Sequence, residues 1–310
     1  MKETKTLRRM VEDLGQALRG KYSPVFDLEA AGLKERLEGE LGKIYSLDPL
    51  SPKDLEDYRP LVGVDGSNQR RGGAYPHYIE IFQGLAKSTQ GEAIFTHKIH
   101  TPLLSGLGAE EDRSLSGRYL AEVELEAALL AVKKIRPRVL MLDGGFIRFT
   151  ISAKKAWQDL VEACEDRDIL LIGAIKDTKT HMIADYWGYG DAFFDKDLLY
   201  GKLAPGDFFL VDDDKNSKGE EGFSSGFYRA SRHPEVVGLD MLSSQKDGIL
   251  DMARLLLTLT PRNSRGVNFW IDIVDKEVKL TDDYIQILLE ESLDRDLYER
   301  FFISERDRRN

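Results

Sequence analysis

Two short apolar segments that each run into an Asp-Gly dipeptide constrain the fold of this chain more than any other feature. The first reads LVGVDGS and contains Asp65, and the second reads RVLMLDGG and contains Asp143. Runs of β-branched and aliphatic residues before a turn signal predict strands. A single Asp-Gly belongs to a turn more often than to a catalytic site. Two of them, each closing a strand, predict two carboxylates at one edge of a sheet.

The segment between the two dipeptides predicts two strands and one long helix. Strands are expected at residues 75–88 and 91–101, because the TQGE sequence near their junction is typical of a hairpin. Ser114 can cap a helix that Pro137 ends. The chain therefore opens with three strands and then a helix.

The second Asp-Gly strand is followed by a helix over 154–167 and a strand over 168–178. An antiparallel opening followed by strand-helix-strand units matches a ribonuclease H-like arrangement, in which the first and fourth strands are neighbours. We therefore predict an α/β fold with a ribonuclease H-like mixed sheet flanked by helices. This topology would place Asp65 next to Asp143, where both could face a metal ion.

The first sixty residues predict two amphipathic helices. The segment DPLSPKDLEDYRP is rich in proline and gives the best boundary, so we expect an N-terminal helical extension at 1–58 and a main domain at 59–310. The extension could be a packing layer, a dimerisation arm or a partner-binding segment. Its two apolar stripes are Leu7, Met10, Val11, Leu14 and Leu18, and then Leu33, Leu37, Leu41 and Ile44.

The net charge of −10 argues against binding of nucleic acid over the whole surface, because such binding needs Lys and Arg to neutralise phosphates. A local basic groove is compatible with this charge. Arg70 with Arg71, and Arg262 with Arg265, are candidate phosphate contacts. Ordinary solvated charge is the competing interpretation for both pairs.

The composition is that of an ordinary soluble globular protein. No apolar run approaches the length of about 18 residues that a membrane span needs. The charged N-terminus has no apolar signal-peptide core, so we expect a cytoplasmic location. The single cysteine, Cys164, excludes an internal disulfide and a cysteine-based zinc cluster.

Carboxylates at a sheet edge are suited to phosphodiester cleavage with two divalent ions, which take hard oxygen ligands. A third carboxylate would come from the long helix, which offers Glu122, Glu124 and Glu126. Glu122 and Glu126 share a face four residues apart, whereas Glu124 is expected to point elsewhere. Lys176 ends the next strand and could contact the scissile phosphate or hold a carboxylate. A solvated lysine is the alternative there.

The ordered motifs GVDGSN, a Glu-bearing helix, LMLDGGF, GAIKDT and LTPRNSRG resemble the NurA family of nucleases over most of residues 58–275. The resemblance implies a ribonuclease H-like fold with Mn²⁺-dependent 5′-to-3′ exonuclease and single-strand endonuclease activity. It also implies a homodimer that acts with the HerA hexameric ATPase in DNA end resection. The cofactor would be two Mn²⁺ or Mg²⁺ ions.

The resemblance also implies roles for particular residues. Asp65 and Asp143 match the two strand-end metal ligands of the family, and Lys176 matches its lysine after the next strand. We choose Glu126 as the helix carboxylate because of its distance before the second aspartate, with Glu122 as the second choice.

One motif departs from the family pattern. In the family, a run rich in tyrosine and proline follows PRN and ends in a metal-site histidine, whereas this chain reads GVNFWIDIVDKEV. The place of the histidine falls on Asp275, which could bind a hard cation but cannot act as a neutral imidazole.

Three functions are compatible with these features. The first is a metal-dependent nuclease that acts on DNA ends with water as the nucleophile. The second is a catalytically inactive DNA-binding or adaptor subunit of a HerA-like motor, which the missing histidine favours and the retained acids oppose. The third is a phosphotransferase related to actin and hexokinase, for which the chain is short and has few glycine-rich phosphate loops.

Overall fold

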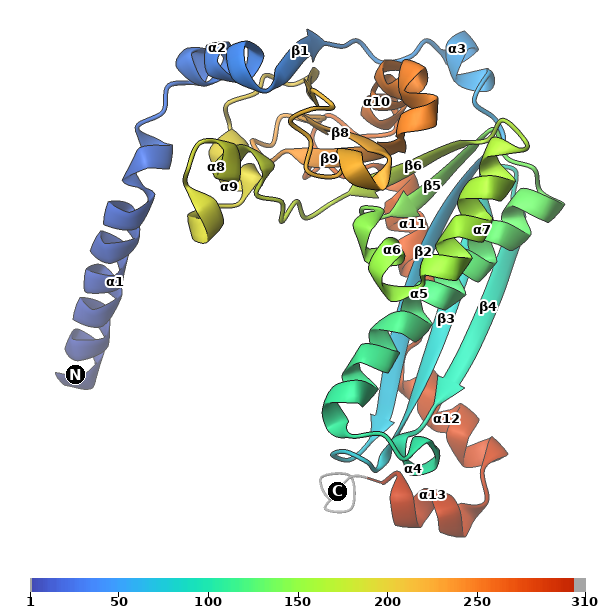
Figure 1. The fold of residues 1–310 in the computed structure, drawn as a ribbon. Coiled ribbons are helices and arrows are strands. Elements are labelled where there is room, and N and C mark those ends of the chain that lie inside the picture. Colours follow the sequence, from blue (N-terminus) through green and yellow to red (C-terminus); the bar gives the residue numbers. More distant parts are fainter. Residues whose placement is uncertain (1, 304–310) are drawn as a thin grey trace.

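A mixed sheet of nine strands forms the centre of the described structure (Figure 1). The computed structural model describes residues 2–303, and residues 304–310 of the predicted main domain lie outside the described residues. Across the sheet the order is β1-β7-β8-β9-β6-β5-β2-β3-β4. In chain order the strands are β1 (Gly42–Ser46), β2 (Leu61–Gly72), β3 (Tyr78–Ser88), β4 (Ala93–His100), β5 (Val139–Asp143), β6 (Leu170–Ile175), β7 (Asp207–Val211), β8 (Phe223–Tyr228) and β9 (Val237–Leu242).

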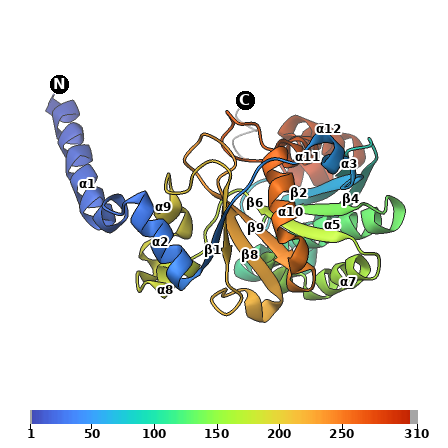
Figure 2. The same cartoon turned by 90° about the horizontal axis from the view of Figure 1, so that it is seen from above.

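Helices flank this sheet (Figures 1 and 2). None of those in the described part of the chain is both long and apolar enough to cross a membrane. They are α1 (Lys2–Phe26), α2 (Ala30–Glu40), α3 (Pro52–Glu56), α4 (Pro102–Ser105), α5 (Ala109–Lys134), α6 (Ile147–Ser152), α7 (Lys154–Glu165), α8 (Met182–Tyr186), α9 (Asp195–Leu199), α10 (Ile249–Thr258), α11 (Phe269–Val278), α12 (Asp282–Ser292) and α13 (Arg295–Phe301), with 3-10 turns at Gly190–Ala192, Gly219–Glu221 and Ser243–Gly248.

The strand arrangement confirms the predicted ribonuclease H-like topology. β2, β3 and β4 are antiparallel, and β5 and β6 run parallel to β2 on its other side. The predicted hairpin forms between β3 and β4, where the Ser88 N–H donates to the Glu92 carbonyl at 2.8 Å. Beyond β6, the strands β9, β8, β7 and β1 extend the sheet with antiparallel pairing.

The central strands are buried on both faces. Successive side chains of a strand point to opposite sides. Val62 and Leu140 therefore pack in one core with α5 and α7, whereas Leu61 and Met141 pack in another with α10 and α11. This double burial explains why the parallel strands read as short continuous apolar runs.

The N-terminal segment divides into two structurally different parts. α1 projects away from the body, and its predicted stripe from Leu7 to Leu18 is exposed (Figures 1 and 2). Leu33 and Leu37 of α2 are buried against α8, α9 and β7. The second predicted stripe does not continue as a helix to Ile44, because residues 42–46 form β1, an edge strand of the main sheet.

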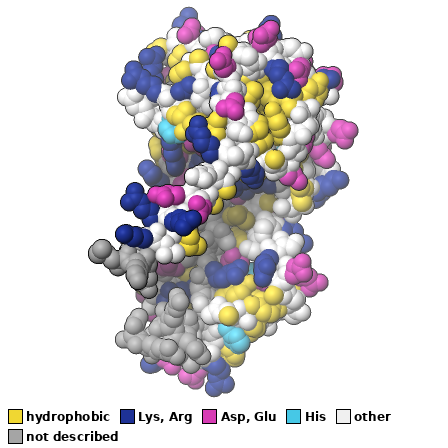
Figure 3. Space-filling model, turned by 90° about the vertical axis from the view of Figure 1, so that its left-hand side faces the viewer, with side chains coloured by type: hydrophobic (Ala, Val, Ile, Leu, Met, Phe, Trp, Pro, Cys, Tyr) yellow, Lys and Arg dark blue, Asp and Glu magenta, His cyan; other side chains and the backbone are white. Residues whose placement is uncertain are grey.

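Charges of both signs share the surface. The chain has a net charge of −10, yet basic and acidic side chains are interspersed over the face shown in Figure 3. A local basic surface is therefore compatible with the acidic total.

The close approach of α5 to the sheet predicts a strong effect of a methyl group at Gly84. A Cβ there would lie 2.3 Å from the Val123 carbonyl oxygen of α5, which is backbone and cannot rotate away. We expect Gly84→Ala to lower the free energy of unfolding by about 1–3 kcal/mol in urea denaturation. Gly117→Ala, on the exposed side of the same helix with open space around it, should instead raise it by about 0.5–1 kcal/mol. Equal effects of the two substitutions would contradict this explanation.

Candidate metal centre

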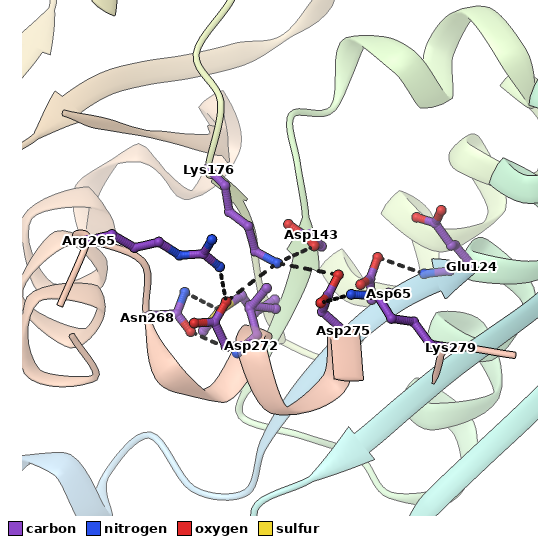
Figure 4. Close-up of polar contacts among 12 residues, drawn as sticks. Asp65, Glu124, Asp143, Lys176, Arg265, Asn268, Asp272, Asp275 and Lys279 are labelled. Carbon is purple, nitrogen blue, oxygen red and sulfur yellow. Dashed lines mark hydrogen bonds and ion pairs between the residues drawn. The ribbon is translucent and has the colours of Figure 1, made fainter. Parts of the chain in front are cut away.

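Three carboxylates from three separate elements converge where β2 and β5 part. Asp65 lies in β2, Asp143 ends β5 and Asp275 lies in α11, and each contributes an oxygen to a group within 4.8 Å of one another. Figure 4 shows their side chains directed toward one another with Lys176 beside them. The structure thus brings together four of the residues that the sequence predicted for the site.

Strand register explains why the first two carboxylates meet. The parallel pairing of β2 with β5 ends with Val64 opposite Leu142. Asp65 and Asp143 are the next residues on the two strands, so they leave the paired region side by side. Both lie on the face that α11 covers, since Gly63 faces this helix and a Cβ on it would lie 3.0 Å from α11 side chains.

The prediction that a strand ends at Asp65 is wrong. β2 continues to Gly72 and stays paired with β3 to that point. Gly66 provides space rather than a turn, because a Cβ on it would lie 2.5 Å from the Cγ atom of Glu124. Gly84 lies opposite Gly66 on β3. The two glycines let α5 approach closely enough for Glu124 to reach the strand beside Asp65.

Glu124 is the helix carboxylate at this centre, and the prediction of Glu126 is corrected. Glu124 is 1% exposed, and its charge raises the pKa of Asp65. Glu126 is exposed, because a residue two positions along a helix points to the opposite side. Glu122, the second choice, is partly exposed and forms an ion pair with Lys98 of β4.

An apolar stripe in the sequence of α5 could have identified Glu124. Apolar residues recur at steps of three and four along this helix and mark the side that faces the core. An acid within such a stripe is informative, because glutamate is seldom buried without a function or a partner. The spacing of Glu122 and Glu126 places both on one side of the helix, but it does not show whether that side faces the core. The stripe that includes Glu124 consists of Ala121, Leu125, Ala128, Ala131 and Val132.

Lys176 lies among the carboxylates, as predicted. Its Nζ atom is 2.8 Å from Asp143 Oδ2, 4.0 Å from Asp275 Oδ1 and 3.9 Å from Asp272 Oδ1. Lys279 approaches from the other side and contacts Asp275 Oδ2 at 2.7 Å. Two lysines therefore offset part of the negative charge of the group.

Arg148 is a further cation of the site, and the sequence did not predict it. It forms two hydrogen bonds to the Glu124 carboxylate, one of them at 3.1 Å, and donates to the Asp143 carbonyl at 2.9 Å. This arginine thus joins the carboxylate of α5 to the end of β5. Its position one turn after the LDGG motif was the available signal.

A buried ion pair holds the loop that follows Asp143. The Asp240 carboxylate accepts the Phe146 N–H at 3.2 Å and contacts Lys218 Nζ at 2.6 Å. A Cβ on Gly145 would lie 2.9 Å from Asp240 Oδ2, so only glycine lets the loop pass this close. Asp240 and Lys218 were not predicted. They fix the backbone that presents Asp143.

Burial and mutual repulsion raise the pKa values of the inner carboxylates. The pKa of Asp65 is raised to about 8, mainly by burial and also by the charges of Asp143 and Glu124. Burial raises the pKa of Glu124 to about 7 despite the opposing effect of Arg148. The pKa of Asp143 is also raised by burial, against the effect of Lys176. Ionisation of all three together is therefore costly without an added cation.

The pKa of Asp275 is shifted in the opposite direction. Burial alone would raise its pKa, but the hydrogen bond from Lys279 and the charge of Lys176 outweigh burial and lower it. Asp275 is therefore ionised at neutral pH and provides a permanent negative charge beside the inner carboxylates.

The donor set fits a hard divalent cation. Mg²⁺ and Mn²⁺ prefer carboxylate oxygens, and opposite ligands of an octahedral Mg²⁺ ion lie about 4 Å apart. The 4.8 Å limit on the oxygens of Asp65, Asp143 and Asp275 is close to this span. These three acidic residues could therefore bind a metal ion after small side-chain rotations.

The four predicted DNA-contacting arginines lie in two places. Arg70 contacts Glu80 at 3.1 Å, and Arg71 donates to Gln286 at 2.8 Å, both toward the far end of β2. Five residues of strand separate Arg70 from Asp65, or about 17 Å. The other two lie on the loop before α11, close to the carboxylates.

Arg265 on that loop contacts Asp272 Oδ1 at 3.2 Å, and Arg262 is exposed three residues earlier. Arg265 therefore contacts a residue beside the candidate centre. Arg70 pairs with β3 and Arg71 with α12 instead.

A model of the NurA domain matches residues 59–280 of the chain. This chain belongs to the NurA family. The match spans every element that carries a carboxylate of the candidate centre, and it supports a nuclease. A search of curated protein sequences found no match.

Several solved structures match the chain with low sequence identity and low TM-scores. Human ENDOV has 15% sequence identity and a TM-score of 0.36 over 80% of this chain and 95% of its own. Endonuclease V of Ciona intestinalis, bound to a 24mer DNA containing an inosine followed by a ribo-adenosine, has 14% identity and a TM-score of 0.34 over 80% and 97%. The C-terminal lobe of a budding yeast Argonaute has 9% identity and a TM-score of 0.33 over 80% and 54%. The assignment of the chain to the NurA family rests on the domain match.

The raised pKa of Asp65 predicts a pH-dependent stability of the metal-free protein. Unfolded, this group ionises near its ordinary value of 3.8, whereas in the folded protein its pKa is about 8. Between these values the folded state holds a proton that the unfolded state has lost, so stability falls as pH rises. In EDTA, Asp65→Asn should therefore raise the thermal midpoint more at about pH 8.5 than at about pH 5.

Glu126→Gln on the exposed face of α5 is the matched control and should leave the pH dependence unchanged. An equal increase for Asp65→Asn at both pH values would show that this carboxyl does not titrate in that range.

Proposed function

We propose that the chain is a divalent-metal-dependent deoxyribonuclease that hydrolyses phosphodiester bonds at the candidate metal centre. The observation that carries this proposal is the convergence of Asp65, Asp143 and Asp275 from three elements of the fold on one point. Buried carboxylates are paired with cationic side chains or coordinate metal ions, and here two lysines offset only part of the negative charge of the group. Membership of the NurA family supports the same reaction.

The residues of the centre have distinct tasks in this proposal. Asp65, Asp143 and Asp275 hold a Mn²⁺ or Mg²⁺ ion, and Glu124 lies beside Asp65 as the acid for a second ion. The bound metal would activate the attacking water and stabilise the leaving oxygen. Lys176 keeps Asp143 in place from 2.8 Å and offers a positive charge to the phosphate.

Asp275 supports an active enzyme over the inactive subunit. The residue at the place of the family histidine lies within the acidic group, where its carboxylate can bind the same hard cation. We propose that the centre is retained with an altered ligand. A DNA-binding or adaptor subunit without activity is the alternative, and it predicts no cleavage under any metal condition.

We extend the proposal to the biological setting that the family implies. The activities would be 5′-to-3′ exonuclease and single-strand endonuclease, used in DNA end resection and repair. The chain would act in the cytoplasm as a homodimer with a HerA-type hexameric ATPase. The exposed apolar stripe of α1 is available for either protein contact.

Cleavage of end-labelled single- and double-stranded DNA tests the reaction. We expect cleavage with Mn²⁺ or Mg²⁺ and none with EDTA. Asp65→Ala should lower the rate by a factor of about 100 or more, because it removes a carboxylate that holds the metal. Absence of cleavage by folded wild-type protein, with and without a HerA-type partner, would establish the inactive alternative.

Glu124 and Glu126 give a matched comparison on one helix. Glu124→Gln should lower the cleavage rate by a factor of about 10 or more, since it removes a charge at the centre. Glu126→Gln should cleave at the wild-type rate because its side chain is exposed on the other side of α5. The reverse result would show that Glu126, and not Glu124, is the α5 carboxylate that the reaction needs.

Mn²⁺ binding measured by calorimetry tests Asp275 without relying on activity. Asp275→Asn should weaken binding by a factor of about 10 or more, since a charged oxygen ligand is lost. Asp275→His should retain more affinity than the asparagine variant because it restores the metal-site residue that the family resemblance implies at this place. Equal affinity of wild type and Asp275→Asn would remove this residue from the metal site.

A further inference from the structure

A groove at the sheet edge that carries the candidate metal centre is lined by four chain segments, two of which are the loops with Ser231 and Pro261. The cavity has a volume of about 560 Å³, within the range of ligand sites. The less exposed part of its lining, here called the floor, includes the apolar residues Leu47, Ala230 and Leu257, and the exposed part, here called the rim, includes Asp48, Arg232 and Arg262.

The two loops are held together by backbone contacts. One loop joins β8 to β9 and the other joins α10 to α11. The Arg232 N–H donates to the Arg262 carbonyl at 2.9 Å, and Ser231 Oγ donates to the Ser264 carbonyl at 2.9 Å. The Arg229 guanidinium adds hydrogen bonds to three backbone carbonyls nearby. The groove is therefore preorganised.

The guanidinium groups of Arg232 and Arg262 are available to a ligand. Both side chains are exposed, and within the described part of the chain neither forms an ion pair or a side-chain hydrogen bond. Their contributions to the loop contact come from backbone atoms alone. Two unpaired arginines on the rim of one groove favour an anionic ligand.

The groove and the metal centre lie at the same edge of the sheet. Arg265, on the same loop as Arg262, contacts Asp272, which lies 3.9 Å from Lys176 of the centre. Three residues of chain separate Arg262 from Arg265, at most about 11 Å. The other loop follows the same sheet edge, because β9 begins beside the end of β6, with Ile175 paired with Gly238.

We propose that this groove holds a nucleotide of single-stranded DNA that lies a few nucleotides along the strand from the one at the metal centre. Arg232 and Arg262 would bind its phosphates, and the apolar floor would contact the face of its base. The proposal rests on the proposed nuclease function. A single strand fits because its bases are free to leave the stack, whereas a duplex presents mainly phosphates to such a rim. Without an aromatic ring in the floor, we expect little sequence preference.

Binding of a labelled oligothymidine to the full-length protein in EDTA tests the phosphate contacts. The double variant Arg232→Ala/Arg262→Ala should weaken binding by a factor of about 10 or more at low salt. It should also reduce the slope of log affinity against log salt by about 1.4, since each single-strand phosphate contact contributes about 0.7. Unchanged affinity and slope would overturn the proposal.

Arg138→Ala is the matched control. This exposed arginine precedes β5, whereas Asp143 ends it, so the two lie at opposite edges of the sheet, about 17 Å apart. It should bind DNA as the wild type does. A loss equal to that of the double variant would show a general charge effect and overturn the groove. Thermal unfolding of each variant confirms that it is folded.

Two further probes test the single-strand and base contacts. An abasic chain of the same length should bind the wild type more weakly than oligothymidine, and equal binding would overturn the base contact. A blunt duplex should lose less affinity in the double variant, and an equal loss would overturn the single-strand assignment. Because binding is measured in EDTA, failure here is distinguishable from failure of the metal-dependent cleavage.

Discussion

The parallel register between β2 and β5 is the constraint on which the rest of the site depends. With Val64 opposite Leu142, the two next residues are aspartates on the same face of the sheet. A slip of one residue would send Asp65 to the opposite face, toward α5, and leave its apolar neighbours facing the wrong core. The apolar residues that fix the register are therefore also what positions the carboxylates. Core packing and site geometry are set by the same pairing.

Two helices then close on this point from opposite faces, and glycines decide how near they come. Gly63 admits α11, which carries Asp275, and Gly66 admits the side chain of Glu124 from α5. A larger residue at Gly63 would press on Trp270 and Val274 of α11, and one at Gly66 would displace the Glu124 side chain, so each would move a carboxylate away from Asp65. The glycine of the Asp-Gly dipeptide thus matters for the approach of a neighbouring helix, although it reads as a turn residue.

The sequence predicts the parts of the site that depend on strand order and misses those that depend on helix orientation. Asp65, Asp143 and Lys176 follow from apolar runs and topology, and Asp275 follows from motif spacing. Glu124 was missed because its orientation depends on which side of α5 is buried. Lys218 with Asp240 forms a contact between residues far apart in the chain, which no local pattern records. β1 was missed because a five-residue strand is too short to stand out from a helical stripe.

The charge arrangement around Asp275 leaves the group of acids able to accept a cation. A neutral imidazole at that place would add no charge, whereas the carboxylate adds a negative charge to three acids that already repel one another. Lys279 lies 2.7 Å from it and lowers its pKa, so the added charge is stabilised locally. Asp65 and Glu124 are buried beside it with raised pKa values, so further negative charge at this point is costly in the absence of a cation. A cation bound among them would relieve that repulsion, and the free energy gained would contribute to the affinity for the metal ion.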